Sequence, residues 1–200
     1  MNNSIFIRLS GWAFIIGAIA FLPGAIGMLS WEGESTGPTP VIMQLVAFAV
    51  FLAPLLMVLG MLGLRARYKI GGGFLLFGAI VGGLLVVVGI LVQFLTPDYS
   101  VSITYYYVWL GGVAILNVCL LLFGFVAFFE KPLPRWNWLP LAAGSWIVLL
   151  PLLAGITGFQ SSSVIIAGLV IMTILQVMLG YMLQADGTDD IKTSQQGQPA

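Results

Sequence analysis

The 200-residue sequence has no histidine and a single cysteine, Cys119. These two residue types are the usual protein ligands of zinc, copper, haem iron and iron–sulfur clusters, so no metal site and no cofactor are expected. One cysteine also excludes a disulfide within the chain. Cys119 lies inside an apolar run, where a free thiol packs as a small hydrophobic group, and we expect that role for it.

Charged residues are scarce as well. Lysine, arginine, aspartate and glutamate together make up 7% of the chain, seven basic against seven acidic, whereas 60% of the residues are hydrophobic. The mean hydropathy is +1.09, far above that of soluble domains, and this predicts an integral membrane protein. The balanced charge provides no basic surface for a polyanion, so nucleic acid is not expected as a partner.

The apolar segments lack the ionisable side chains that usually carry out catalysis or proton transfer. None of them has an ionisable residue at its middle depth, which leaves proton relays, carboxylate-coupled transport and acid–base catalysis without their groups. The triple serine at 161–163 has no histidine to activate it, and the glycines at 71–73 lack the following lysine and hydroxyl residue of a phosphate loop. No catalytic residues are therefore assigned, and the chain is not expected to be an enzyme.

What the sequence does contain is a series of apolar segments of membrane length. A bilayer core about 30 Å thick is spanned by roughly 20 apolar residues in a helix. Residues 1–184 therefore predict an all-α bundle of six transmembrane helices, and residues 185–200 a disordered cytoplasmic tail. The six predicted helices are at about 7–29, 41–64, 70–95, 106–129, 138–158 and 163–184.

The basic residues identify the side of the membrane on which each connection lies. If the chain crosses six times, all seven lysines and arginines fall on the side that holds both termini. The positive-inside rule assigns that side to the cytoplasm. Their predicted role is to anchor this topology, and an anionic-lipid patch at 65–69 is a second interpretation. Five of them flank the connections between crossings: Arg65, Arg67, Lys69, Lys131 and Arg135.

The first apolar segment has an alternative interpretation. Arg8 precedes an apolar stretch that contains the small-residue pattern Ala18-Ile19-Ala20, as a cleaved signal peptide would. The stretch continues through Leu29, however, which is longer than a typical signal core. A retained crossing is therefore favoured.

A weak internal repeat divides the six helices into pairs. "FIIGAIA" at 14–20 is similar to "LLFGAIV" at 75–81 and partly to "LAAGSWI" at 141–147, and each follows a basic residue at the same distance. The even-numbered helices carry "LMVLG", "LLLFG" and "QVMLG" in corresponding places. Similarity at a fixed spacing is typical of repeated units, so three helical hairpins are the simplest interpretation.

Small residues recur along one face of the first and third predicted helices. Lipid is as apolar as leucine, so membrane helices associate through close backbone approach, and glycines at steps of three and four residues permit it. Whether the partner helix belongs to this chain or to another protein is open at this stage. The predicted packing residues are Gly17, Gly24, Gly78, Gly82 and Gly89.

Two amides lie near the middle depth of the predicted bundle, Asn117 on the fourth helix and Gln176 on the sixth. Amides within the membrane most often form hydrogen bonds between helices, each contributing roughly 0.6 to 2 kcal/mol. They are alternatively candidate binding groups, either for a small polar ligand or for the metal of a pigment. Pro54 and Pro151 lie within the second and fifth crossings and predict kinks there.

Three segments carry a resemblance to known sequences. "RLSGWAFIIGAI" at 8–19, "LGLRARYKIGGGFLLFGAIVGG" at 62–83 and "LPRWNWLPLAAGSW" at 133–146 resemble segments of small six-helix bacterial membrane proteins of unknown function. The resemblance rests on glycine, leucine and basic residues. It implies a protein of the prokaryotic cytoplasmic membrane and no catalytic residues.

Two functions follow from the sequence. The sequence favours the first, a non-enzymatic accessory or structural subunit, because the apolar segments lack charge at middle depth and the connections are too short for an extramembrane domain. Its partners would be membrane lipids and other membrane-protein subunits or a second copy of itself. The second is a small transporter or channel for a neutral or lipid-like solute, with Asn117 and Gln176 as its polar contacts. A cavity lined by both amides would favour the second function, and a glycine face turned away from the chain would favour the first.

Overall fold

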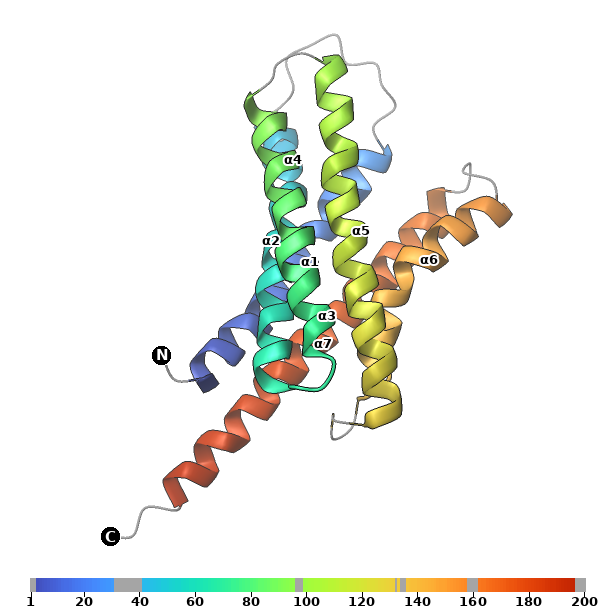
Figure 1. The fold of residues 1–200 in the computed structure, drawn as a ribbon. Helices are drawn as coiled ribbons and strands as arrows, with labels where there is room; N and C mark the ends of the chain where they lie inside the picture. Colours follow the sequence, from blue (N-terminus) through green and yellow to red (C-terminus); the bar gives the residue numbers. More distant parts are fainter. Residues whose placement is uncertain are drawn as a thin grey trace.

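The computed structural model describes residues 3–30, 41–95, 99–131, 133, 136–157 and 162–196, and every regular element within them is a helix (Figure 1). The predicted all-α class is therefore confirmed. In chain order the elements are α1 (Asn3–Ser30), α2 (Val41–Arg67), α3 (Gly72–Phe77), the π-helical turn η1 (Gly78–Gly82), α4 (Gly83–Leu95), α5 (Tyr99–Glu130), α6 (Leu139–Thr157) and α7 (Ser162–Gln196).

Five helical segments among these residues are long and apolar enough to cross a membrane. They are Ser4–Pro23, Phe48–Arg67, Gly72–Val92, Tyr106–Glu130 and Ile165–Ala185. The third combines α3, η1 and α4 into one continuous crossing. The remaining predicted crossing corresponds to α6, which has 19 residues, and a sixth span stays a prediction.

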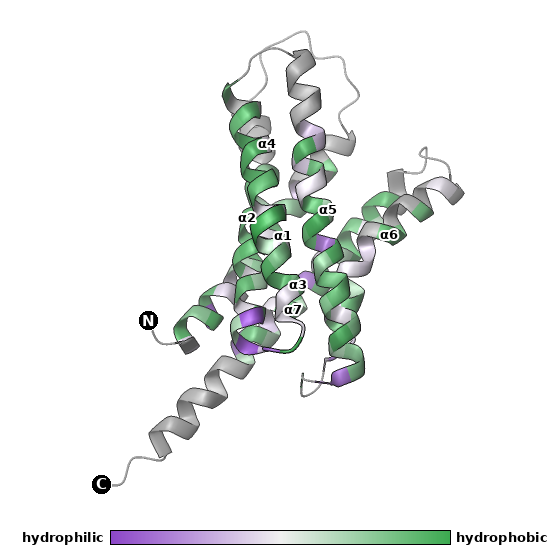
Figure 2. Cartoon of the chain, in the orientation of Figure 1, coloured by the Kyte–Doolittle hydropathy of each residue, from purple (hydrophilic) through white to green (hydrophobic). Residues whose placement is uncertain are grey.

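The surface of these helices fits a lipid environment. Within each of the five segments, between 39% and 50% of the residues are buried inside the protein. Many of the exposed side chains are large and apolar, among them Ile16, Leu84, Phe125 and Ile174. Hydrophobic colour predominates in the part of the helices that Figure 2 colours. A helix satisfies its own backbone hydrogen bonds, so apolar segments of this kind are stable in hydrocarbon.

The helices surround a common centre. The contacts run from α2 to α1, from α1 to α7, and on through α6 and α5 to α4, which returns to α2. Helices that follow one another in the chain pair as hairpins, and the contact between α1 and α7 closes the bundle. In Figure 1 the far ends of α6 and α7 diverge from the corresponding part of α5.

The connection between α2 and α3 is a tight turn built around Gly71. Its φ of 70° is in the left-handed region, which glycine adopts at little cost because it has no Cβ atom. The amide of Tyr68 donates to the carbonyl of Leu64 at 2.8 Å, so hydrogen bonding at the end of α2 continues into the turn. The turn places Lys69 at the end of one helix and Gly72 at the start of the next.

The last helix is longer than the sequence predicts. α7 continues to Gln196 rather than ending near residue 184, so residues 185–196 are helical where a polar tail without fixed structure was expected. Extending an existing helix adds one hydrogen bond per residue without the cost of starting a new one. Residues 197–200 lie outside the described part of the chain.

The described basic residues gather toward one end of the bundle. Arg65 and Lys69 at the α2–α3 turn and Lys131 after α5 are exposed, and hydrophilic colour marks both places in Figure 2. Arg67 is half-buried, and Arg135 lies outside the described residues. The start of α1 and the end of α7 lie toward this same end (Figure 1).

Candidate functional site

A small cavity lies at the centre of the bundle, between α1, α2, α5 and α7. Its volume is about 30 Å³. Both amides singled out in the sequence line it, Asn117 from α5 and Gln176 from α7. The remaining lining residues are apolar or small: Phe14, Gly17, Ala18, Phe21, Ala53, Pro54, Met57, Val113 and Met172.

Asn117 has an unused hydrogen-bond acceptor at this cavity. Its side chain is 5% exposed, and its Nδ2 donates to the carbonyl oxygen of Val113 at 2.9 Å within the same helix. The Oδ1 atom is buried and has no hydrogen-bond partner among the described residues. The expected bond between helices is thus not what Asn117 makes. An unpaired buried carbonyl costs roughly 1 to 3 kcal/mol, which a bound donor would recover.

Gln176 approaches the cavity from α7. It is 6% exposed, and it lies three residues after Thr173, whose hydroxyl donates to the carbonyl of Leu169 at 2.8 Å. Thr173 thus bonds its own helix backbone, as does Ser145, which donates to the carbonyl of Ala142 at 2.8 Å. The threonine and the serine are satisfied locally, whereas the two amides face a shared space.

The size and the charge of the cavity limit what it can hold. A volume of about 30 Å³ exceeds what one water molecule needs. The lining contains no ionisable side chain, so a charged molecule would lose its hydration without gaining a counter-charge. The arrangement therefore suits a small neutral molecule that donates a hydrogen bond to Asn117.

Pro54 is part of the wall. It is buried within α2 and lines the cavity directly. Proline has no amide hydrogen, so the carbonyl of Val50, one turn earlier, loses its usual helical donor and the helix is weakened at this depth. Pro151 lies within α6, but its side chain is outside what the structure describes.

The predicted packing glycines are covered by helices of this chain. A Cβ atom on Gly17 would lie 3.1 Å from the carbonyl oxygen of Ala53 on α2. On Gly78 it would lie 2.6 Å from the Cβ of Cys119 on α5, and on Gly82 it would lie 3.0 Å from the carbonyl oxygen of Gly112.

Gly89 makes a similar approach to α5. There a Cβ atom would lie 2.8 Å from the Cα of Trp109. The surroundings of Gly24 fall outside the described residues.

Other glycines also allow two helices to approach closely, although they are not among the predicted packing residues. Gly11 of α1 meets Gly180 of α7, and Gly124 and Gly144 bring α5 and α6 together. Gly180 and Gly124 do stand at the ends of the repeated "LG" and "FG" segments. Repeat-equivalent glycines differ in their contacts, however, since Gly17 packs within its own hairpin and Gly144 packs on the preceding one.

Aromatic residues near the membrane surfaces divide into two groups. Trp136 and Trp138 are exposed, as expected of rings at the lipid headgroup level. Trp109 of α5 is instead only 4% exposed. Its indole Nε1 donates to the carbonyl of Phe51 at 3.5 Å, and the two rings meet edge to face with centroids 5.1 Å apart. Trp109 therefore links α5 to α2 within the core.

Comparison of the chain with protein-family models, with curated proteins and with solved structures found no match.

Proposed function

We propose that this multi-pass membrane protein binds a small neutral solute inside the membrane and allows it to cross. The observation that carries the proposal is the buried, unpartnered Oδ1 atom of Asn117 at a central cavity that Gln176 also lines. Amides both donate and accept hydrogen bonds, so the pair suits a molecule with an O–H or N–H group.

The rest of the wall defines the class of solute. Phe14, Phe21, Met57 and Met172 present apolar surface, and thioether side chains adapt easily to a guest. Few polar groups in an apolar wall orient a ligand without holding it strongly. Water and small neutral molecules such as urea and glycerol have the required chemistry.

Passage needs the helices around the cavity to separate, because about 30 Å³ is smaller than most organic solutes. Pro54 supports this step, since a helix that lacks one backbone hydrogen bond bends more readily at that place. Its position in the wall couples any bending of α2 to the size of the cavity.

The accessory-subunit role has less support. It predicts small-residue faces that are free to receive another protein, whereas Gly17, Gly78, Gly82 and Gly89 are occupied by helices of the same chain. Localisation in a prokaryotic cytoplasmic membrane, with both termini in the cytoplasm, is part of the proposal and rests on the distribution of basic residues.

Solute flux into proteoliposomes tests the proposal. The purified full-length protein is reconstituted, and swelling after a gradient of water, urea or glycerol is followed by stopped-flow light scattering. We expect flux of at least one of these solutes above that of empty liposomes, and loss of it in Asn117→Leu and Gln176→Leu. Ser145→Ala is the matched control, because Ser145 bonds its own helix and is not part of the wall.

Flux equal to that of empty liposomes for every solute would overturn the transport proposal. The subunit role is tested separately by gentle extraction from native membranes, followed by mass spectrometry of the co-purifying proteins. A stoichiometric second membrane protein, combined with no flux, would establish the subunit role instead.

A further inference from the structure

Two surface hollows flank the start of α3, away from the central cavity. The first is an apolar groove of about 640 Å³ between α3 and α5. Phe74, Phe77, Val118 and Leu122 form its exposed walls, and buried Cys119 lies at its base. On α5 the groove extends from Leu122 to Ala114, so it runs roughly 12 Å along the helix axis.

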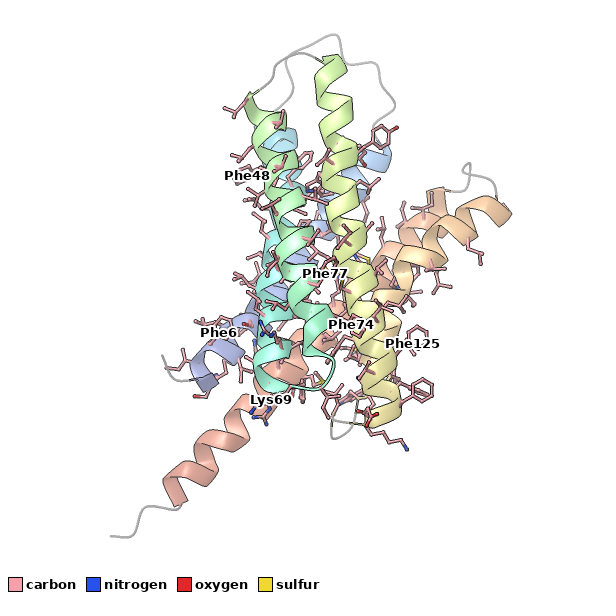
Figure 3. All side chains as sticks on the ribbon, viewed as in Figure 1. Phe6, Phe48, Lys69, Phe74, Phe77 and Phe125 are labelled. Carbon is pink, nitrogen blue, oxygen red and sulfur yellow. The ribbon has the colours of Figure 1, made fainter. Side chains whose placement is uncertain are left out.

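The second hollow is basic. It has a volume of about 580 Å³ and lies between the end of α2 and the start of α3, with Phe6 of α1 at its side. Arg65 and Lys69 line it, and both are exposed. Neither is paired with a carboxylate among the described residues. Figure 3 shows Lys69 near the end of the bundle, with Phe74 and then Phe77 farther along α3.

Gly73 belongs to both hollows and joins them. It is exposed, and a Cβ atom placed on it would have no neighbour within 4 Å, so the surface there is open. Beside it the side-chain stem of Arg65 crosses Gly72, whose Cβ would lie 3.1 Å from the Cγ of Arg65. The lack of side chains at Gly72 and Gly73 allows one molecule to reach from the basic hollow into the apolar groove.

We propose that these joined hollows bind one anionic phospholipid, its phosphate at Arg65 and Lys69 and an acyl chain along Phe74 and Phe77. The basic hollow matches the charged headgroup of such a lipid, and the apolar groove matches its acyl chain. The cations are at the end of the bundle, where headgroups lie, and the groove runs from there toward the middle of the membrane. A zwitterionic lipid has a cationic group that Arg65 and Lys69 would repel. This site is independent of the solute cavity.

Native mass spectrometry of the full-length protein provides the first test. The protein is released from detergent with phosphatidylglycerol or phosphatidylcholine present, and the bound lipids are counted. We expect one tightly retained phosphatidylglycerol and no equivalent phosphatidylcholine. Gly73→Phe fills the junction and keeps every charge, so it should weaken phosphatidylglycerol retention at least about tenfold. Gly155→Phe on α6 is the matched control, since Gly155 is also exposed and has no neighbour within 4 Å of a Cβ.

Removal of the charges provides the second test. Arg65→Gln combined with Lys69→Gln should weaken retention about thirtyfold, since each cation near an anionic headgroup contributes about 1 kcal/mol. Lys131→Gln removes an exposed cation at the same end of the bundle but outside both hollows, and it should leave retention unchanged.

A third measurement separates a lipid from free phosphate. Inorganic phosphate and glycerophosphoglycerol carry the anionic group without acyl chains, and neither should displace the bound lipid at millimolar concentration. Displacement by either would overturn the proposal in favour of a simple anion site. Equal retention of phosphatidylcholine, or retention unaffected by Gly73→Phe, would overturn it as well.

Discussion

The carbonyl oxygen of Gly180 on α7 lies where a side chain at position 11 on α1 would begin, and the relationship is reciprocal. A Cβ atom on Gly11 would be 2.6 Å from that oxygen, and one on Gly180 would be 2.5 Å from the carbonyl oxygen of Gly11. Both obstacles are backbone, which cannot rotate away as a side chain can. The first and last helices of the chain therefore approach this closely at that point because both positions are glycine.

Gly11→Ala should consequently destabilise the protein. Inserting a methyl group into a closely packed contact costs about 1 to 3 kcal/mol, against a gain of up to about 1 kcal/mol from the better helix propensity of alanine. Thermal unfolding of the purified protein in detergent measures the effect. Gly155→Ala has open space around it and should be neutral or stabilising. Equal stability of the two variants would contradict the close contact between α1 and α7.

Asn117→Leu should stabilise the protein while it removes the proposed solute flux. The substitution eliminates a buried acceptor without a partner, worth about 1 to 3 kcal/mol, and leucine has the same branched arrangement of heavy atoms. The carbonyl of Val113 keeps its backbone hydrogen bond in the helix. Thr173→Val serves as the comparison, because that hydroxyl is bonded to Leu169 and its removal should change the unfolding free energy by less than about 1 kcal/mol. A marked loss of stability in Asn117→Leu would mean that Oδ1 has a structural partner.

Trp109→Ala should be among the most damaging single substitutions in the chain. The side chain is 4% exposed, packs on Gly89 and Phe51, and spans from α5 to α2. Truncating a buried tryptophan costs about 3 to 5 kcal/mol. Trp136 is 40% exposed, so Trp136→Ala should cost far less. Denaturant unfolding compares the two variants, and similar midpoints would argue that Trp109 belongs to the membrane surface.

Accessibility labelling should place residues 34 and 131 on opposite sides of the membrane. In a Cys119→Ala background, Glu34→Cys should react with an impermeant maleimide from outside intact cells, and Lys131→Cys only after permeabilisation. The reason is that basic residues are retained on the cytoplasmic side during insertion. Reaction of both positions in intact cells would refute this orientation. It would also refute the three predicted crossings between residues 34 and 131, since an odd number is needed to place them on opposite sides.

Much of the fold could be predicted because membrane insertion depends on local properties. Segment length and hydropathy are properties of about 20 consecutive residues, and five predicted crossings coincide with helical segments of the required kind. The connection between α2 and α3 was also predictable, because basic residues and glycines interrupt the apolar sequence around Lys69. The end of α7 was harder to predict, since residues 185–196 are too polar for a crossing but can still continue a helix.

The candidate site could be predicted only in part. Asn117 and Gln176 stand out in the sequence because polar side chains are rare at that depth, but nothing in the sequence places them at one cavity. The role of Pro54 in its wall and the burial of Trp109 were likewise not predictable. Each depends on which face of a helix turns inward, and the hydropathy of an all-apolar helix is nearly the same on every face.

The sequence by itself determined that the chain enters the membrane as successive helices, with its cations at one end, because burial in hydrocarbon acts on each segment separately. Only the tertiary structure decided which helices touch. An apolar helix face is as stable against lipid as against another helix, so hydrophobicity does not select its neighbour. Which helices pack together depends on how closely their backbones can approach, at pairs such as Gly11 and Gly180. That fit brings α5 and α7 around one centre, and it is the reason two amides 59 residues apart line the same cavity.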